Sequence, residues 1–571
     1  MRGFLTSAAW LCLVVTLCVP YAAGADAVPV RYDLVIRNGR VVDGTGNPWF
    51  VGDIGVQADR IAAVGRIPAG AGTREIDATG LVVSPGFIDI HTHSDTLLLE
   101  DGLAQSKIRQ GVTTEVLGES DSPGPSQGKL APQKLTVRGK TLRWTTLDEY
   151  FRTLEQEGTA VNVASYVGMG RIWRCVMGDS FERPTAEQRQ QMHELIRQAM
   201  ADGAMGMSNM LATPPGLLAT TDDIVELCRE VQKAGGIYSS HIRNEGTGVF
   251  AAVKEAISIG RRADIPVDII HLKIADQQYW GRMGEIVGLI DAARASGVNV
   301  QANVYPYTRG NNDLASIVPP WAHEGGTAKL LERLKDPAQR PRLKREIKEG
   351  LPDWYNHYTA VGSDWSRMLI SKETTFKGLT MDRVLAARVK TKTPPPDLVD
   401  EFLDYLIQEG GSVGTVYAHH TEEDMTTALQ QPWCSIGSDG SSYAIEGPLR
   451  RGNPHPRSFG TFPRVLGAYV RELKVLKLED AIRKMTSLNA SKLGIRDRGL
   501  IRAGCYADLV IFDAATIIDK SAYTEPFQYA EGVRLVVVNG DIVLDGGTHT
   551  GKKPGKALRR IQSAPAESSR P

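Results

Sequence analysis

Long apolar runs are scarce in this 571-residue sequence. One uncharged apolar stretch lies near the amino terminus, from about Phe4 to Val19, between a single arginine and the small residues Ala23-Gly24-Ala25. It is short for a membrane span and has the layout of a secretory signal. We therefore expect residues 1–25 to be a signal peptide, the mature protein to be exported to the periplasm or secreted, and no membrane partner.

An excess of charge of either sign is also missing. The 66 lysines and arginines balance 66 aspartates and glutamates, so the formal net charge is zero. Without a basic surface, nucleic acid is not an expected partner. A small-molecule substrate is the simpler expectation, and the oligomeric state is left open.

Cysteine is rare, with six residues in the whole chain. An exported protein could pair the four that follow the leader, but their wide spacing matches no metal-binding pattern. We expect these four to be core residues: Cys175, Cys228, Cys434 and Cys505.

Apolar runs alternate with helix-like stretches through the middle of the chain, residues 86–498. Repeated β-then-α units favour an α/β fold with a parallel sheet, and this many units favours a closed TIM-like (β/α)8 barrel. A charged, proline-rich stretch near 309–400 breaks the rhythm and is expected to be an insertion that covers the active site. The apolar runs are 160–168, 204–210, 236–246, 264–273, 297–307 and 413–420.

Short alternating segments with Gly and Asn-Gly turns flank this region on both sides. They occupy 32–46 and 53–65 near one end and 504–513 and 533–547 near the other. We expect one small β-sandwich domain assembled from residues 30–85 and 499–550.

Only eleven histidines are present, yet His91 and His93 stand one residue apart at the end of an apolar run. We expect residues 87–93 to form a buried strand. Side chains two apart on a strand project to the same face, so both imidazoles should point at one object. That object could be a metal ion.

Three other predicted strands end in chemically useful side chains, His241, His271 and Asp439. In a (β/α) barrel these strand ends form one rim, where catalytic groups gather. Imidazole suits zinc better than magnesium or calcium, and bound zinc supports hydrolysis. Asp439 would take a proton from the attacking water and pass it to the leaving nitrogen.

At these residues the sequence resembles the amidohydrolase superfamily, and within it the D-aminoacylases, or N-acyl-D-amino-acid deacylases. The likeness is carried by SPGFIDIHTHSD (84–95), SSHIRNEG (239–246), HLKIA (271–275), GSDG (437–440) and PHPRSFGTFPRVLG (454–467). The last segment is the most specific to the deacylase branch.

The resemblance implies a site with one or two zinc ions. It makes His91, His93, His241 and His271 metal ligands and Asp439 the acid/base, and it places Lys273, Tyr305 and Arg457 where deacylases hold the substrate carboxylate and amide oxygen. An arginine can grip a carboxylate through two parallel hydrogen bonds. The alternative for Arg457 is a structural salt bridge.

One departure from the family pattern concerns a metal ligand. Deacylases usually carry Asn-Cys-Gly after the second strand, with Cys as ligand, whereas this chain has Gly118-Glu119-Ser120-Asp121. Four imidazoles bring no negative charge, so an anionic ligand beside Asp439 would benefit the site. Glu119 can supply it; Asp121 is the rival, and the alternative is that Glu119 only caps the following loop.

The expected function is a zinc-dependent amidase that releases a D-amino acid from an N-acyl-D-amino acid or a D-terminal dipeptide. A second interpretation is a cyclic amidohydrolase related to hydantoinases and dihydroorotases. Those relatives commonly use a carbamylated lysine, yet no lysine lies between Lys140 and Lys233. A third is an exported binding protein without catalysis, against which the intact Asp439 speaks. The side chain and acyl group of the substrate are left open.

Overall fold

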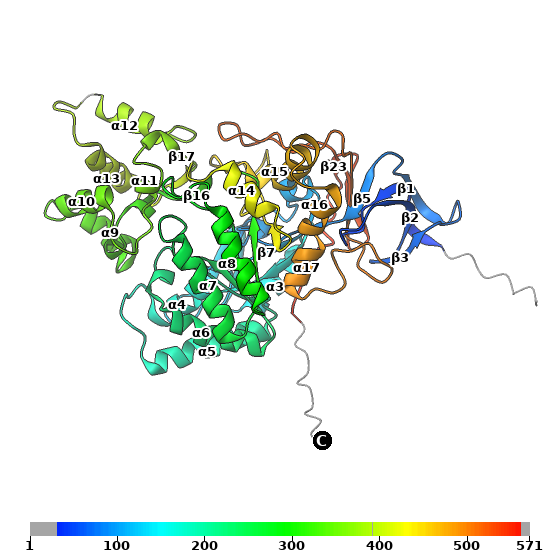
Figure 1. The fold of residues 1–571 in the computed structure, drawn as a ribbon, viewed down its shortest axis with the longest axis horizontal. Helices are drawn as coiled ribbons and strands as arrows, with labels where there is room; N and C mark the ends of the chain where they lie inside the picture. Colours follow the sequence, from blue (N-terminus) through cyan, green and yellow to red (C-terminus); the bar gives the residue numbers. More distant parts are fainter. Residues whose placement is uncertain (1–30, 391, 561–571) are drawn as a thin grey trace, which may run out of the picture.

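A computed structural model describes residues 31–390 and 392–560 (Figure 1). The expected signal peptide, residues 1–25, lies outside this part of the chain. Within the described residues, we find no helix with the length and apolar character needed to cross a membrane.

Parallel strands form the centre of the molecule. Six pair in the order β11-β12-β13-β14-β15-β19 and three in the order β10-β7-β6, and all these pairings are parallel. This confirms the predicted α/β class. The strands are β6 (Phe87–Asp89), β7 (Val112–Leu117), β10 (Asn162–Ser165), β11 (Val167–Gly168), β12 (Gly206–Met210), β13 (Ile237–His241), β14 (Val267–Ile269), β15 (Val300–Val304) and β19 (Cys434–Ile436).

The two parallel sheets are linked at both edges. Tyr166 alone separates β10 from β11, so one sheet leads directly into the other. At the opposite edge Thr92, just after β6, forms a parallel bridge with Gly440, just after β19. The carboxyl ends of the strands are thereby brought toward one another.

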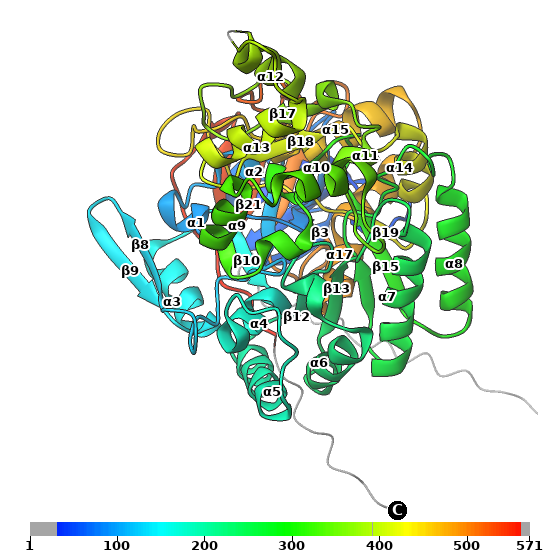
Figure 2. The same ribbon diagram turned by 90° about the vertical axis from the view of Figure 1, so that its left-hand side faces the viewer.

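Helices connect successive strands and cover the outside of the sheets. Figure 2 shows α5, α6, α7 and α8 around β12, β13 and β15. Thr185 and Thr220 begin α5 and α6 with capping boxes, in which the side chain accepts from a backbone N–H three residues on. The helices are α4 (Met169–Met177), α5 (Ala186–Ala201), α6 (Thr221–Lys233), α7 (Val249–Ala263), α8 (Met283–Ala295), α14 (Glu422–Leu429), α15 (Arg457–Arg464), α16 (Leu478–Met485) and α17 (Ser487–Leu493).

Residues 310–417 form the insertion segment, which has its own hydrophobic core. Figure 1 shows its helices α9 to α13 grouped on the side of the molecule away from β1 and β2. A three-stranded antiparallel sheet, β16-β18-β17, completes it. Its elements are β16 (Gly310–Asp313), α9 (Gly326–Lys335), α10 (Arg340–Glu349), α11 (His357–Ala360), β17 (Met368–Ile370), α12 (Met381–Val389), α13 (Leu398–Gln408) and β18 (Gly414–Tyr417).

The prediction that 413–420 is one of the central parallel strands was wrong. β18 pairs antiparallel with β16 and β17, and Tyr417 is buried in the core of the insertion segment. Apolar periodicity identifies a buried strand but not the sheet in which it is buried. β18 therefore packs with the elements of the insertion segment and not with the central sheets.

Strands from both ends of the described chain share one nine-stranded sheet, in which β5 pairs antiparallel with β20. Leu34, Ile36, Val83 and Leu509 lie in its buried cluster. The strands are β1 (Tyr32–Val41), β2 (Phe50–Gln57), β3 (Arg60–Gly65), β4 (Gly72–Asp77), β5 (Val82–Pro85), β20 (Leu509–Phe512), β21 (Val533–Val538), β22 (Asp541–Asp545) and β23 (Thr548–His549).

The remaining elements lie between β6 and β10. They are α1 (Leu97–Glu100), α2 (Gln105–Ile108), the antiparallel pair β8 (Gln133–Val137) and β9 (Lys140–Trp144), and α3 (Leu147–Glu157). The four cysteines of the described residues are all buried and unpaired, as expected for core residues.

Candidate metal centre

The Glu119 carboxylate lies among four imidazoles. Its Oε2 is 2.7 Å from His91 Nε2 and 3.1 Å from His93 Nε2. Its Oε1 is 2.9 Å from His241 Nδ1 and 4.0 Å from His271 Nε2. The two oxygens of one carboxylate therefore face two different pairs of imidazoles.

The backbone after β7 explains how Glu119 reaches this position. Gly118 adopts φ +93°, a conformation that L side chains rarely adopt, and a side chain there would collide with the carbonyl of Tyr166. The turn brings Glu119 inward, where its side chain is 4% exposed. Asp121 points elsewhere: its side chain is 53% exposed and its Oδ1 lies 3.0 Å from Arg171 Nε.

His91 and His93 follow β6 and do not form part of it. The expected strand 87–93 is shorter than predicted, because β6 ends at Asp89. Thr92 nevertheless bridges to Gly440, so the two imidazoles stay on one side of an extended segment. Their ring centroids are 5.1 Å apart.

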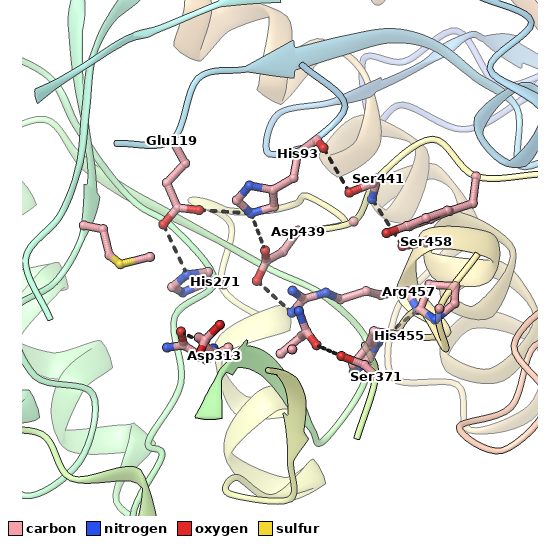
Figure 3. A pocket seen from close by; sticks show the side chains of 18 of the residues that line it. His93, Glu119, His271, Asp313, Ser371, Asp439, Ser441, His455, Arg457 and Ser458 are labelled. Atoms are coloured by element: carbon pink, nitrogen blue, oxygen red, sulfur yellow. Dashed lines mark hydrogen bonds and ion pairs between the residues drawn. The ribbon is translucent and has the colours of Figure 1, made fainter. Parts of the chain in front are cut away.

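Asp439 contacts both this imidazole pair and a cation. Its Oδ1 lies 2.9 Å from His93 Nε2, and its Oδ2 lies 2.7 Å from Arg457 Nη1 (Figure 3). Burial alone would raise the pKa of Asp439, but the Arg457 guanidinium and the imidazoles hold it well below its usual range. Asp439 is therefore an anion at neutral pH.

Two backbone conformations at the site are uncommon for residues other than glycine. Asp439 has φ 50° and His271 has φ 40°. Such conformations concentrate at functional sites, where the surrounding structure enforces them. Here the Asp439 backbone N–H donates to the His91 carbonyl at 2.8 Å, and the His271 N–H donates to Asn303 Oδ1 at 3.0 Å.

The donors form two groups that share Glu119. One group contains His91, His93, Glu119 and Asp439, and the other contains Glu119, His241 and His271; within each group the donor atoms lie within 4.8 Å of one another. Imidazole nitrogens and carboxylate oxygens are zinc ligands. The donor set therefore fits a zinc site, and Glu119, which belongs to both groups, would be among the residues that hold the metal.

Sequence reasoning missed Glu245, which lies directly behind two of these imidazoles. Lys273 Nζ donates to Glu245 Oε1 at 2.5 Å, and His271 Nδ1 lies 3.1 Å from the same oxygen. Glu245 Oε2 is 3.7 Å from His241 Nε2. Burial would raise the pKa of Glu245, but Lys273 and the imidazoles lower it well below its usual value. The signal in the sequence that could have identified Glu245 was its position four residues after His241.

A cavity of about 360 Å³ opens over the centre. His93, Glu119, Asp439 and Arg457 are among the residues that line it, as Figure 3 shows. Asn311, Asp313 and Ser371 of the insertion segment also line it.

Lys273 and Tyr305, which the resemblance placed at the substrate, lie behind the residues that line this cavity. Lys273 is 6% exposed and is held by Glu245, and neither it nor Tyr305 is among the lining residues. The Tyr305 ring lies under Arg457, with the guanidinium carbon 4.7 Å from the ring centroid. Within the described residues the buried Tyr305 hydroxyl has no hydrogen-bond partner.

Comparison with known proteins gives extensive matches. The Amidohydrolase family model matches residues 74–544. A D-aminoacylase of Alcaligenes xylosoxydans xylosoxydans is 35% identical over 541 residues, which cover 94% of this chain and 99% of the relative. An N-acyl-D-glutamate deacylase of the same organism is 32% identical, with 93% and 98% covered.

Solved structures agree with these matches. The N-acyl-D-glutamate deacylase of Bordetella bronchiseptica, crystallised with zinc and a phosphonate inhibitor, has a TM-score of 0.75 at 30% identity and covers 93% of this chain and 100% of that one. A D-aminoacylase crystal structure has a TM-score of 0.76 at 34% identity, covering 92% and 100%. A D-hydantoinase, at 16% identity and a TM-score of 0.51, shares the fold alone. The imidazoles and carboxylates that lie together after the central strands agree with these matches. Matches of this extent show that the protein belongs to the D-aminoacylase branch of the amidohydrolase superfamily.

Proposed function

We propose that this protein is a zinc-dependent hydrolase of linear amide bonds, which releases a D-amino acid from an N-acyl-D-amino acid or a D-terminal dipeptide. The observation that carries the proposal is the Glu119 carboxylate between two pairs of imidazoles, with Asp439 beside them. The relatives named D-aminoacylase and N-acyl-D-glutamate deacylase support the substrate class.

The metal would be held by His91, His93, Glu119, His241 and His271, with Asp439 at the edge of the first group. Zinc bound there would polarise the amide carbonyl and lower the pKa of the attacking water. Glu245 would orient His271 from behind, because its Oε1 lies 3.1 Å from His271 Nδ1 and a carboxylate that accepts from the second ring nitrogen fixes which nitrogen faces the metal.

Asp439 is placed to move the proton. It is an anion that lines the cavity, so it can accept a proton from the attacking water and deliver it to the leaving nitrogen. The leaving amino acid would then lie on the Asp439 side of the cavity, next to Arg457.

Arg457 suits the carboxylate of that amino acid. Among the described residues its one ion pair is with Asp439, through Nη1, which leaves other guanidinium N–H groups for a substrate. For Lys273 and Tyr305 to contact substrate, as the resemblance implies, their side chains would have to move toward the cavity.

We also propose the finer architecture. The link through Tyr166 and the bridge between Thr92 and Gly440 support a (β/α)8 barrel over residues 86–498. The insertion segment would act as a lid, because its residues line the cavity of about 360 Å³ over the proposed metal centre, called the catalytic cavity from here on. The nine-stranded sheet supports a separate small β domain, a sandwich by prediction, from residues 30–85 and 499–550. Export rests on the leader sequence alone, and amino-terminal sequencing of the mature protein tests it.

A combined metal and substrate measurement tests the function. Purified protein is analysed for bound metal and screened against N-acetyl-D- and N-acetyl-L-amino acids, D-terminal dipeptides and hydantoins. We expect zinc and hydrolysis confined to linear substrates with a D-amino acid. Turnover of hydantoins alone, or no turnover by the zinc-loaded protein, would overturn the proposal.

A further inference from the structure

A second cavity, of about 430 Å³, adjoins the catalytic cavity. Met210, Asn312 and Asp313 line both, so the two spaces meet at these residues. The volume falls in the range of small-molecule sites. A molecule held at the metal centre could therefore extend into the second cavity.

The junction lies on a defined side of the metal centre. Met210 ends β12 and pairs in register with His241, which ends β13. Arg457 lies on the other side: in Figure 3 it stands beyond Asp439 as seen from Glu119. The second cavity is thus reached past His241, away from the Asp439–Arg457 pair.

The walls of the two cavities differ in chemistry. The larger apolar side chains of the catalytic cavity are Met210, Tyr443 and Pro454. The second cavity presents many more, among them Phe181, Pro214, Pro215, Leu218, Val318 and Trp354. Most of these are only partly buried, so apolar surface faces the open space.

Several polar groups in the second cavity are engaged within the protein. Asp313 Oδ1 accepts from the Ala315 backbone N–H at 2.7 Å, and His323 Nε2 lies 3.3 Å from the Val318 carbonyl oxygen. These groups need no partner from a ligand. Two charged residues, Arg174 and Asp179, also line the cavity, so apolar contact is the main but not the sole chemistry that its wall offers an occupant.

Three parts of the chain enclose this space. They are the end of α4 with the residues after it, 174–181, the loop after β12, residues 212–218, and the insertion segment. The first and the third are joined where the Gly325 backbone N–H donates to the Asp179 carbonyl at 3.2 Å. The insertion segment therefore contributes to the size of the cavity.

The direction of the substrate follows from the proposed function, on which this step rests. Asp439 serves the leaving nitrogen, so the amino acid lies toward Asp439 and Arg457. The acyl group on the other side of the scissile bond must then point past His241 toward Met210. We infer that the second cavity binds the acyl group, and that the protein favours N-acyl-D-amino acids with an uncharged, apolar acyl group of the size of octanoyl or phenylacetyl.

A chain-length series tests this inference. The zinc-loaded full-length protein is assayed on one D-amino acid carrying acetyl, butanoyl, hexanoyl, octanoyl or phenylacetyl groups, and on the matching L-leucyl dipeptide. Each methylene moved from water into the cavity should raise kcat/KM about fourfold until the cavity is full, so octanoyl should exceed acetyl at least tenfold. A flat or falling series, or a dipeptide preferred over octanoyl, overturns the inference.

Two variants and a matched control locate the effect. Leu218→Trp fills the cavity and Leu218→Asn makes its wall polar at similar volume; each should lower the octanoyl-to-acetyl ratio of kcat/KM at least tenfold. Leu473→Trp, at a site 56% exposed and outside both cavities, should keep the wild-type ratio. Wild-type ratios in both Leu218 variants overturn the inference. Failure to hydrolyse any acylated amino acid, including acetyl, would instead contradict the proposed function, and this inference would fall with it.

Discussion

The Arg457 guanidinium lies 2.7 Å from the Asp439 carboxylate, and both side chains are almost fully buried in the wall of the catalytic cavity. The pair explains how a buried carboxylate stays ionised, because the adjacent cation offsets the cost of burial. It also couples the proposed proton carrier to the residue proposed to hold the substrate carboxylate. For a variant at either residue, both the metal content and the turnover of the protein should therefore be measured.

Replacing Asp439 with Asn should leave the metal bound and lower kcat by two or more orders of magnitude. The amide keeps the shape of the carboxylate but cannot carry the proton, while His91, His93 and Glu119 remain as ligands. Metal analysis and steady-state kinetics on the same preparation measure the two effects. Near-normal turnover would rule out Asp439 as the proton carrier.

Replacing Arg457 with Lys should weaken hydrolysis of substrates with a free carboxylate far more than hydrolysis of the matching amides. Lysine cannot reproduce a two-pronged contact, although it retains a positive charge near Asp439. Some loss is expected on both substrate types because the ion pair with Asp439 is altered. Equal losses on both would leave Arg457 with the structural role alone.

Much of the candidate site was predictable because each proposed ligand lies at or just after a strand end. His241 ends β13, and His271 and Asp439 follow β14 and β19 within three residues. Apolar runs reveal strand ends, and parallel strands bring their carboxyl ends to one rim. The fold class and the set of histidines followed from that pattern.

Other features depend on contacts that no local pattern encodes. Glu245 lies in the loop after β13, and its place in the site comes from Lys273 and His271, which approach it from the loop after β14. β18 has the apolar pattern of a central strand, but its partners are β16 and β17. The choice between Glu119 and Asp121 depended on side-chain direction after the turn at Gly118, which sequence spacing alone does not give.

Glu245→Gln should lower metal affinity about 10- to 100-fold, because the carboxylate is placed to orient His271 from behind. Titration of metal-free protein with zinc measures the affinity. Thermal unfolding of the metal-free variant, measured in parallel, separates this effect from the loss of the buried ion pair with Lys273.

A matched control for Glu245 is Glu255→Gln. Glu255 also pairs with a basic residue, Arg243, but has no contact with the imidazoles. Its zinc affinity should equal that of the wild type. If both variants bind zinc as the wild type does, Glu245 does not position the ligands.

The last prediction concerns Glu119, which stands one position before the expected Cys ligand. Because its two oxygens face both pairs of imidazoles, Glu119→Ala should lose metal and activity together. Glu119→Cys should restore part of both, since a thiolate is also an anionic zinc ligand. Asp121→Ala is the matched control and should be mild, because Asp121 is half exposed and pairs with Arg171. Metal analysis and turnover of the three variants decide the matter: full metal content in Glu119→Ala would mean that the imidazoles and Asp439 suffice to hold the ion, and the ligand role of Glu119 would have to be given up.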